Sequence, residues 1–185
     1  MNSPAVVVKV SAKNARLQFA GCSPAYIANV CKARCCESSQ APAGIIVAIH
    51  ACERPVIEAL GGTVIGGLLQ PAPGTRRCPF KQANNLCGLH GGPDKPFGCI
   101  ASPFTLNHNS TLIVRNRYKL LRCYRDGARL PAYVAFRASL DMLFGLDTAA
   151  IICAHLDGGG GDIFAPMPRR HFDAIRDNDA AKRNA

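Results

Sequence analysis

The cysteines of this chain are concentrated in two segments, and this feature constrains the fold more than any other in the sequence. The first segment, 22–36, holds a Cys-x3-Cys-Cys motif, and the second, 78–99, lies in a stretch that is rich in proline and glycine. The cysteines of the two segments are Cys22, Cys31, Cys35, Cys36, Cys78, Cys87 and Cys99. Thiolates grouped in this way bind zinc or iron, or they cross-link into disulfides. The choice between metal and disulfide therefore decides how a region with little regular pattern is held together.

The expected location of the chain favours metal. Residues 1–9 contain neither the basic region nor the long apolar run of a signal peptide, so we expect a cytoplasmic protein. The sequence has no run of about eighteen apolar residues, so no membrane span is expected. In a reducing cytosol, clustered cysteines are more often metal-binding or catalytic than disulfide-bonded. We therefore predict a metal centre, with disulfides or separate buried thiols as the alternatives.

The cysteines differ in their expected roles. The predicted metal ligands are Cys31, Cys35, Cys36, Cys78, Cys87 and Cys99. For Cys22 and Cys123 the sequence leaves ligation and a simple thiol equally open, whereas Cys52 and Cys153 stand in apolar contexts that indicate core thiols. The two segments offer more sulfur ligands than one zinc ion takes, so one site with spare thiols and two separate sites both fit. Spacing alone does not distinguish zinc from an iron–sulfur cluster such as a four-iron, four-sulfur cluster.

The rest of the pattern predicts a small α+β domain organised around this centre. The length of 185 residues suits one domain, which we place at 1–176, followed by a polar tail at 177–185. The run of β-branched residues at 5–10 predicts a strand, and 111–114 and 118–124 read as two further strands. The segment 26–35 favours a short helix, on which Cys31 and Cys35 would share a face.

The C-terminal part, 131–176, is predicted to be helical. An apolar stripe predicts a helix over 131–145, and further helices are expected at 148–156 and 168–176. Asp157 and the four glycines at 158–161 come between the last two. This run superficially matches a nucleotide-binding turn, but a helix rather than a strand is predicted before it, so we interpret it as a glycine loop.

Several motifs within residues 20–105 resemble those of the YkgJ-type family, which is described as zinc- or iron-chelating domains. The motifs are Cys31-x3-Cys35-Cys36, Cys78-Pro79-Phe80, Leu86-Cys87-Gly88-Leu89-His90 and Lys95-Pro96-Phe97-Gly98-Cys99 with Pro103-Phe104. The chain departs from the family pattern in three details: His90 stands where tyrosine is frequent, Lys95-Pro96 replaces Arg-Pro, and Pro103-Phe104 reverses Phe-Pro. The resemblance implies metal or cluster binding.

The loose spacing of the first cysteine segment is more similar to the branch of the family that includes flagellin lysine N-methylase. That branch uses S-adenosylmethionine beside an iron–sulfur cluster. The resemblance therefore implies a modifying enzyme, such as an S-adenosylmethionine-dependent N-methyltransferase, as an expectation for this chain. A metal storage or delivery protein is an alternative that needs no reaction.

Basic residues suggest an anionic partner. The chain carries a formal net charge of +10, and its most basic stretch includes Arg115, Arg117, Lys119 and Arg122. On an extended strand the first three of these side chains would share one face. This face would suit nucleic acid or an acidic protein, although it could equally be an ordinary solvated face of a sheet. A zinc-stabilised, non-enzymatic module that binds nucleic acid is therefore a second hypothesis.

Overall fold

The computed structural model describes residues 4–37, 47–126 and 130–183, with side chains described as far as residue 177. It has a mixed α+β fold, as expected from the sequence. Contacts between residues divide the chain into two compact units. Unit 1 comprises residues 1–22 and 100–176, and unit 2 comprises residues 23–99 and 177–185. The sequence did not predict that the region 23–99, which contains most of the cysteines, would form a unit of its own.

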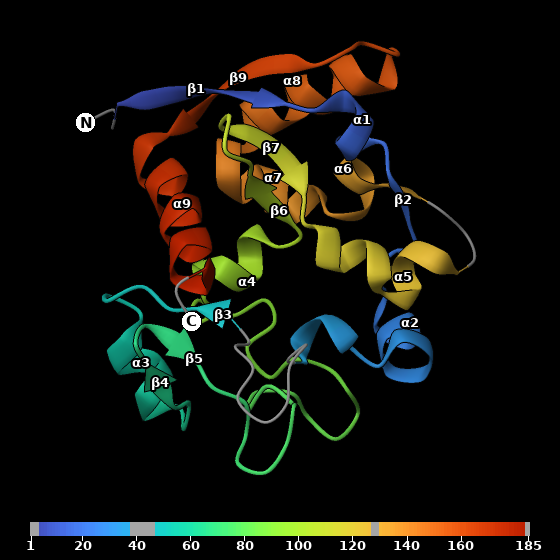
Figure 1. Cartoon of the computed structure of the whole chain (residues 1–185). Coiled ribbons are helices and arrows are strands. Elements are labelled where there is room, and N and C mark those ends of the chain that lie inside the picture. The colour runs from blue at the N-terminus through green and yellow to red at the C-terminus, as the bar shows by residue number, and fades with distance from the viewer. Residues whose placement is uncertain (1–3, 38–46, 127–129, 184–185) are drawn as a thin grey trace. The chain divides into compact units, whose positions relative to one another are not determined.

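Unit 1 is built on a four-stranded sheet with the strand order β6-β7-β1-β9 (Figure 1). Its strands are β1 (Ala5–Val10), β6 (Phe104–Leu106), β7 (Thr111–Val114) and β9 (Ile163–Pro168). β1 pairs in parallel with β7 and antiparallel with β9, in a register that places Val8 opposite Ala165. Because successive side chains of a strand point to opposite faces, Val8 is buried while Val7 is exposed. The strand predicted at 5–10 is therefore confirmed, and its alternation defines the core face of the sheet.

Helices complete unit 1, and their apolar faces form its core. The longest are α7 (Arg137–Phe144), α8 (Leu146–Asp157) and α9 (Arg169–Arg183); α7 and α8 pack against each other and against β9. The fully buried side chains include Leu140, Leu143, Ile152 and Leu156 of α7 and α8. The shorter elements are α1 (Ala12–Ala15), η3 (Asn116–Leu120), α5 (Arg122–Arg125), α6 (Ala132–Ala135) and the paired strands β2 (Gln18–Phe19) and β8 (Leu130–Pro131). Among the described residues, no helix combines the length and apolar character needed to cross a membrane.

Unit 2 contains only short elements. These are α2 (Pro24–Tyr26), η1 (Ile27–Cys31), η2 (Arg34–Cys36), α3 (Arg54–Ala59) and α4 (Phe97–Ala101), with a sheet of β3 (Val47–Ala48), β5 (Leu68–Leu69) and β4 (Val64–Ile65). A small apolar core holds them, and its buried members are Val47, Ile49, Ile57, Val64, Leu69 and Cys78. A core of this size leaves much of the unit dependent on turns and hydrogen bonds. The short helix α3, which ends before Gly61, corresponds to a clear helix signal in the sequence.

The structure corrects the predicted C-terminal part. The region predicted to be helical, 131–176, includes β9, whose Pro166 and Pro168 hide the strand pattern. β9 is an edge strand of the sheet, where proline is tolerated because one side of the strand needs no backbone donors. The helix predicted over 131–145 is divided at Phe136, which leaves the helical region with φ −123°. The tail predicted at 177–185 is helical as far as Arg183, the end of α9.

The prediction of a strand at 118–124 is also wrong. These residues lie in the 3-10 helix η3 and in helix α5. Tyr118 and Cys123 are buried on the inner side of these two turns. The neighbouring prediction of a strand at 111–114 is confirmed as β7.

Candidate metal centre

The two units separate the predicted cysteine ligands. Unit 2 contains all six that the sequence favoured: Cys31, Cys35, Cys36, Cys78, Cys87 and Cys99. Cys22 and Cys123, which the sequence left open, belong to unit 1. Cys123 is buried in α5, and its carbonyl accepts a hydrogen bond of 2.6 Å from the amide of Ala20. The six cysteines that the sequence favoured as ligands therefore all belong to the same unit.

Of the two cysteines predicted to be core thiols, one fits that expectation. Cys153 is buried in α8 of unit 1, where burial raises the pKa of its thiol. Cys52 is exposed, at the turn before α3 in unit 2. The prediction of a core position for Cys52 is therefore wrong, because Cys52 lies in a turn whose residues 51 and 52 are both exposed. All ten cysteines are present as thiols.

The first cysteine segment is bent sharply at Lys32 and Ala33. The π-helical turn η1 ends at Cys31, and both of the next residues take the left-handed conformation, with φ values of 51° and 45°. Left-handed backbone costs a non-glycine residue roughly 1–2 kcal/mol. The 3-10 turn η2 then begins at Arg34 and carries Cys35 and Cys36. The expectation that Cys31 and Cys35 share a helical face is therefore wrong, because the bend separates them into two different turns.

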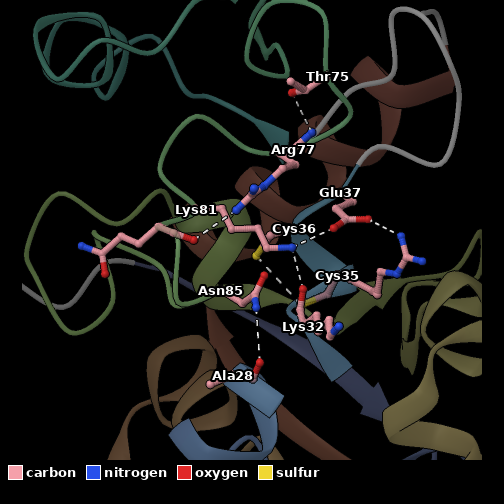
Figure 2. Close-up of polar contacts among 11 residues, drawn as sticks. Ala28, Lys32, Cys35, Cys36, Glu37, Thr75, Arg77, Lys81 and Asn85 are labelled. Carbon is pink, nitrogen blue, oxygen red and sulfur yellow. Dashed lines mark hydrogen bonds and ion pairs between the residues drawn. The ribbon is translucent and has the colours of Figure 1, made fainter. Parts of the chain in front are cut away.

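The second segment folds back on itself between Cys78 and Cys87. The amide of Lys81 donates to the carbonyl of Cys78 at 3.0 Å, and Lys81 and Cys87 form an isolated antiparallel bridge. Asn85, which has a positive φ of 67°, closes the turn and donates from its side chain to the carbonyl of Ala28 at 3.3 Å (Figure 2). The turn is thus anchored to the helical turn η1 within the first cysteine segment.

Backbone pairing brings the two cysteine segments together. The amide of Cys78 donates to the carbonyl of Cys36 at 3.0 Å, and Glu37 and Arg77 form an antiparallel bridge beside it. Cys36 and Cys99 both pack against the apolar core that contains Cys78. The sulfur atoms of Cys35 and Cys36 lie 4.0 Å apart. Three stretches of chain that are distant in sequence thus contribute thiols to one region of unit 2.

The pKa values of these thiols reflect their burial and proximity. Burial, reinforced by the neighbouring thiols, raises the pKa of Cys78 to about 11 and that of Cys99 to about 12. The pKa of Cys36 is raised by its contact with Cys35, by burial and by the nearby Cys99 and Cys78. The raised pKa values therefore favour the protonated form of Cys36, Cys78 and Cys99. A bound metal ion would reverse this preference, because it stabilises thiolates directly.

The side-chain positions stop short of a formed coordination site. Among the described residues, no three cysteine, histidine, aspartate or glutamate side chains come together closely enough to hold a metal ion. In a tetrahedral zinc site the sulfur atoms are roughly 3.8 Å apart, given Zn–S bonds of about 2.3 Å. The spacing of Cys35 and Cys36 is close to this value. The other thiols would need new rotamers, which move a cysteine sulfur by up to roughly 3 Å. The donor chemistry therefore fits zinc or iron, whereas the ligand geometry is not formed.

Charged side chains cross-link the same two segments. The Lys81 Nζ donates to a carboxylate oxygen of Glu37 at 2.7 Å and to the carbonyl of Lys32 at 2.5 Å. The other carboxylate oxygen of Glu37 pairs with Arg34 at 2.6 Å, and Figure 2 shows all three contacts. Burial opposes ionisation of Glu37, but the hydrogen bonds from Lys81 and Arg34 outweigh it and hold its pKa below the usual value. Residue types and spacing did not predict the contact between Lys81 and Glu37, because the two residues are 44 positions apart in sequence.

The predicted basic face is not formed in unit 1. Arg115 is buried, and its Nε donates to the carbonyl of Phe104 at 3.2 Å. The 3-10 helix η3 follows at once, so Arg117 and Lys119 are not on a strand with Arg115. Lys119 donates to Asn116, and Arg122 forms an ion pair with Asp126. The strand face expected for Arg115, Arg117 and Lys119 is therefore wrong, whereas binding of nucleic acid or an acidic protein by this stretch stays a prediction.

Comparison of the chain with protein-family models, with curated proteins and with solved structures finds no match. The likeness to the YkgJ-type family therefore rests on the cysteine motifs alone.

Proposed function

We propose that unit 2 binds a thiophilic metal centre, either a zinc ion or an iron–sulfur cluster, through its grouped cysteines. The observation that carries the proposal is the gathering of Cys36, Cys78 and Cys99 from three distant parts of the chain, with Cys35 beside Cys36. Such a centre would cross-link a unit whose apolar core is small and whose regular elements are short. It would supply structural stabilisation in the case of zinc, or electron transfer and substrate activation in the case of a cluster.

The chain's own residues would contribute in distinct ways. Cys35, Cys36, Cys78 and Cys99 are the proposed ligands, and Cys31 and Cys87, which interact electrostatically with Cys35 and Cys78, are the candidates for a larger cluster. The basic side chains around the segments offset the negative charge that thiolates would bring. No residues are assigned to S-adenosylmethionine, so methyl transfer stays an expectation from the resemblance and forms no part of the proposal.

The alternative is that these cysteines are separate buried thiols that bind no metal, because free cysteine is often buried against an apolar core. A metal centre and separate buried thiols respond differently when metal is added. Grouped ligands bind cobalt(II) with the intense absorption of thiolate coordination, whereas separate core thiols do not. The distinction therefore needs a measurement of metal on the whole chain.

The test is metal analysis of the full chain purified under anaerobic conditions, followed by a cobalt(II) titration of the metal-free protein. The expected result is stoichiometric zinc, or iron with sulfide, and a thiolate-to-cobalt charge-transfer band. The variant Cys99→Ser should weaken binding by at least about tenfold, because one of four charged ligands is lost. The matched control is Cys52→Ser, since Cys52 is exposed in the same unit and should leave binding unchanged. A wild-type chain that holds no metal and gives no charge-transfer band would overturn the proposal.

A further inference from the structure

A lysine is buried between the two cysteine segments. The side chain of Lys81 is only 3 % exposed, although lysine is rarely buried in folded proteins. Lys81 lies in the turn between Cys78 and Cys87, and its ammonium group reaches the first segment, beyond Cys31. Burying a charge is costly, and a buried ion pair gives little net stability compared with apolar side chains. Its presence here therefore calls for a role other than general stabilisation.

The contacts of Lys81 define what it holds. One bond goes to the carbonyl of Lys32, the first of the two left-handed residues, and the other goes to the carboxylate of Glu37, just after Cys36. One contact is thus made at the strained bend itself and the other just after the 3-10 turn that carries Cys35 and Cys36 (Figure 2). A strained backbone keeps its conformation only where the surroundings fix it. Lys81 therefore bonds the chain on both sides of Cys35 and Cys36 at once.

We propose that Lys81 is the positioning residue of the thiol group, a role that rests on the metal-binding function proposed above. It holds the bend of the first segment against the turn of the second, so that Cys35 and Cys36 face the region occupied by Cys78. Glu37 is the acceptor through which Lys81 acts, and Arg34 orients the other oxygen of the same carboxylate. Lys81 is not itself a ligand, because an ammonium group has no lone pair to offer.

Two readouts on the full chain test this inference, one without metal and one with cobalt(II). In the metal-free protein, the rates at which iodoacetamide alkylates each cysteine are measured by mass spectrometry. Lys81→Met should raise the rates at Cys35 and Cys36 by about tenfold relative to exposed Cys52, as expected for the loss of two charge-assisted hydrogen bonds. With cobalt(II), the same variant should bind about tenfold more weakly and show a weakened, shifted ligand-field spectrum, which a remote loss of stability would not alter.

Control variants separate positioning from folding. Arg54→Met removes a surface ion pair of similar length, Arg54 with Glu58 at 2.9 Å, from the same unit and should change neither readout. Lys81→Arg keeps a cation with hydrogen-bond donors. It should therefore restore part of the slow alkylation and part of the cobalt(II) binding of the wild type. If Lys81→Met alone does not fold, the double variant Lys81→Met/Glu37→Gln removes both charges together and avoids leaving one of them buried and unpaired. The double variant should fold yet retain the fast alkylation and the altered spectrum.

The outcomes distinguish this inference from the proposed function. A wild-type chain that binds no cobalt(II) overturns the proposed function, and the role of Lys81 in the metal site falls with it. A chain that binds cobalt(II) while Lys81→Met leaves the spectrum and the affinity unchanged overturns the positioning role alone. Unchanged alkylation rates at Cys35 and Cys36 in a folded Lys81→Met variant likewise overturn it, whatever the metal result.

Discussion

The backbone amide of Cys78 donates a hydrogen bond of 3.0 Å to the carbonyl of Cys36, and this bond joins the two cysteine segments of unit 2. It fixes the relative position of the two α-carbons independently of any side-chain rotamer. The bond therefore explains how thiols can be gathered before a metal is present. For Cys36 and Cys78, metal binding would therefore change the side-chain rotamers while this backbone bond is kept.

The raised thiol pKa values predict that metal-free unit 2 becomes less stable in alkaline solution. Cys78 and Cys99 have pKa values of about 11 and about 12 in the folded protein, above their usual 9.0. The folded chain therefore holds these protons more tightly than the unfolded chain does. The stability they contribute is complete below pH 9 and is lost as the pH rises toward 11–12, by on the order of 2–3 kcal/mol for Cys78.

Urea unfolding of the metal-free chain at pH 8 and at pH 10 measures this effect. The variant Cys78→Ala should start from a lower stability and show a smaller decrease between the two pH values. Since metal binding must displace the same protons, cobalt(II) affinity should instead increase with pH over this range. Equal unfolding midpoints at pH 8 and pH 10 would contradict the assignment of raised pKa values.

Charge reversal should lower stability far more at Arg115 than at Lys119, although the sequence placed them on one face. Arg115 is buried and bonded to Phe104, so Arg115→Glu should leave a carboxylate buried and lower the stability of unit 1 by about 3 kcal/mol or more. Lys119→Glu should change stability by less than about 0.5 kcal/mol, because the ammonium group of Lys119 is bonded at the surface to the side chain of Asn116. Thermal unfolding of the two variants checks the difference. Equal melting temperatures would show that Arg115 is not part of the core.

The sequence was informative where one local signal dominated. The strand 5–10, with four valines among its six residues, was predicted correctly, and α3 has the proline near its start and the glycine after its end that are typical of a short helix. The alternation of Arg115, Arg117 and Lys119 is compatible with a strand. The segment instead forms a 3-10 turn, in which the side chain of Tyr118 is buried. β9 was missed because its pairing with β1 depends on a distant partner and its prolines weaken the local signal.

In the candidate site, too, the sequence predicted local features but not contacts between distant residues. Cysteine spacing identified the residues that unit 2 gathers, since the residue type itself carries the chemistry. It did not identify the bend at Lys32 and Ala33, because neither residue type favours the left-handed conformation. It also missed Lys81 and Glu37, whose pairing exists only once the two segments are folded together. Long-range contacts of this kind leave no periodic pattern in a single sequence.

The glycine run at 158–161 should be sensitive to loss of Arg16. The guanidinium of Arg16 donates to the carbonyls of Leu156 and Gly160 at 2.8 and 2.6 Å, which satisfies the C-terminal end of α8. We expect Arg16→Ala to destabilise unit 1 by about 1–3 kcal/mol, because both hydrogen bonds are charge-assisted. Lys13→Ala in the same helix α1 is the matched control and should have little effect. Hydrogen exchange at residues 157–161, faster in Arg16→Ala and unchanged in Lys13→Ala, would locate the effect in this loop.

His171 should make unit 1 sensitive to acid. Its imidazole is partly buried and bonds through Nδ1 to the carbonyl of Leu143 at 3.0 Å, while the neighbouring Arg170 donates to Nε2 at 3.2 Å. Burial lowers the pKa of His171 below its usual 6.5, the bond to Leu143 opposes this change, and the charge of Arg170 adds to it. Because the folded chain binds this proton less readily than the unfolded chain, the stability from His171 is complete above pH 6.5 and is lost as the pH falls.

Urea midpoints measured between pH 7 and pH 5 check this prediction. His171→Gln removes the titrating group and keeps an amide that can donate to the Leu143 carbonyl, so its midpoint should decrease less than that of the wild type. His108→Gln is the control, since it makes the same substitution at an exposed histidine of unit 1. If His171→Gln and the wild type lose stability in parallel as the solution is acidified, the loss arises from carboxylates elsewhere, and His171 is protonated as easily in the folded chain as in the unfolded one.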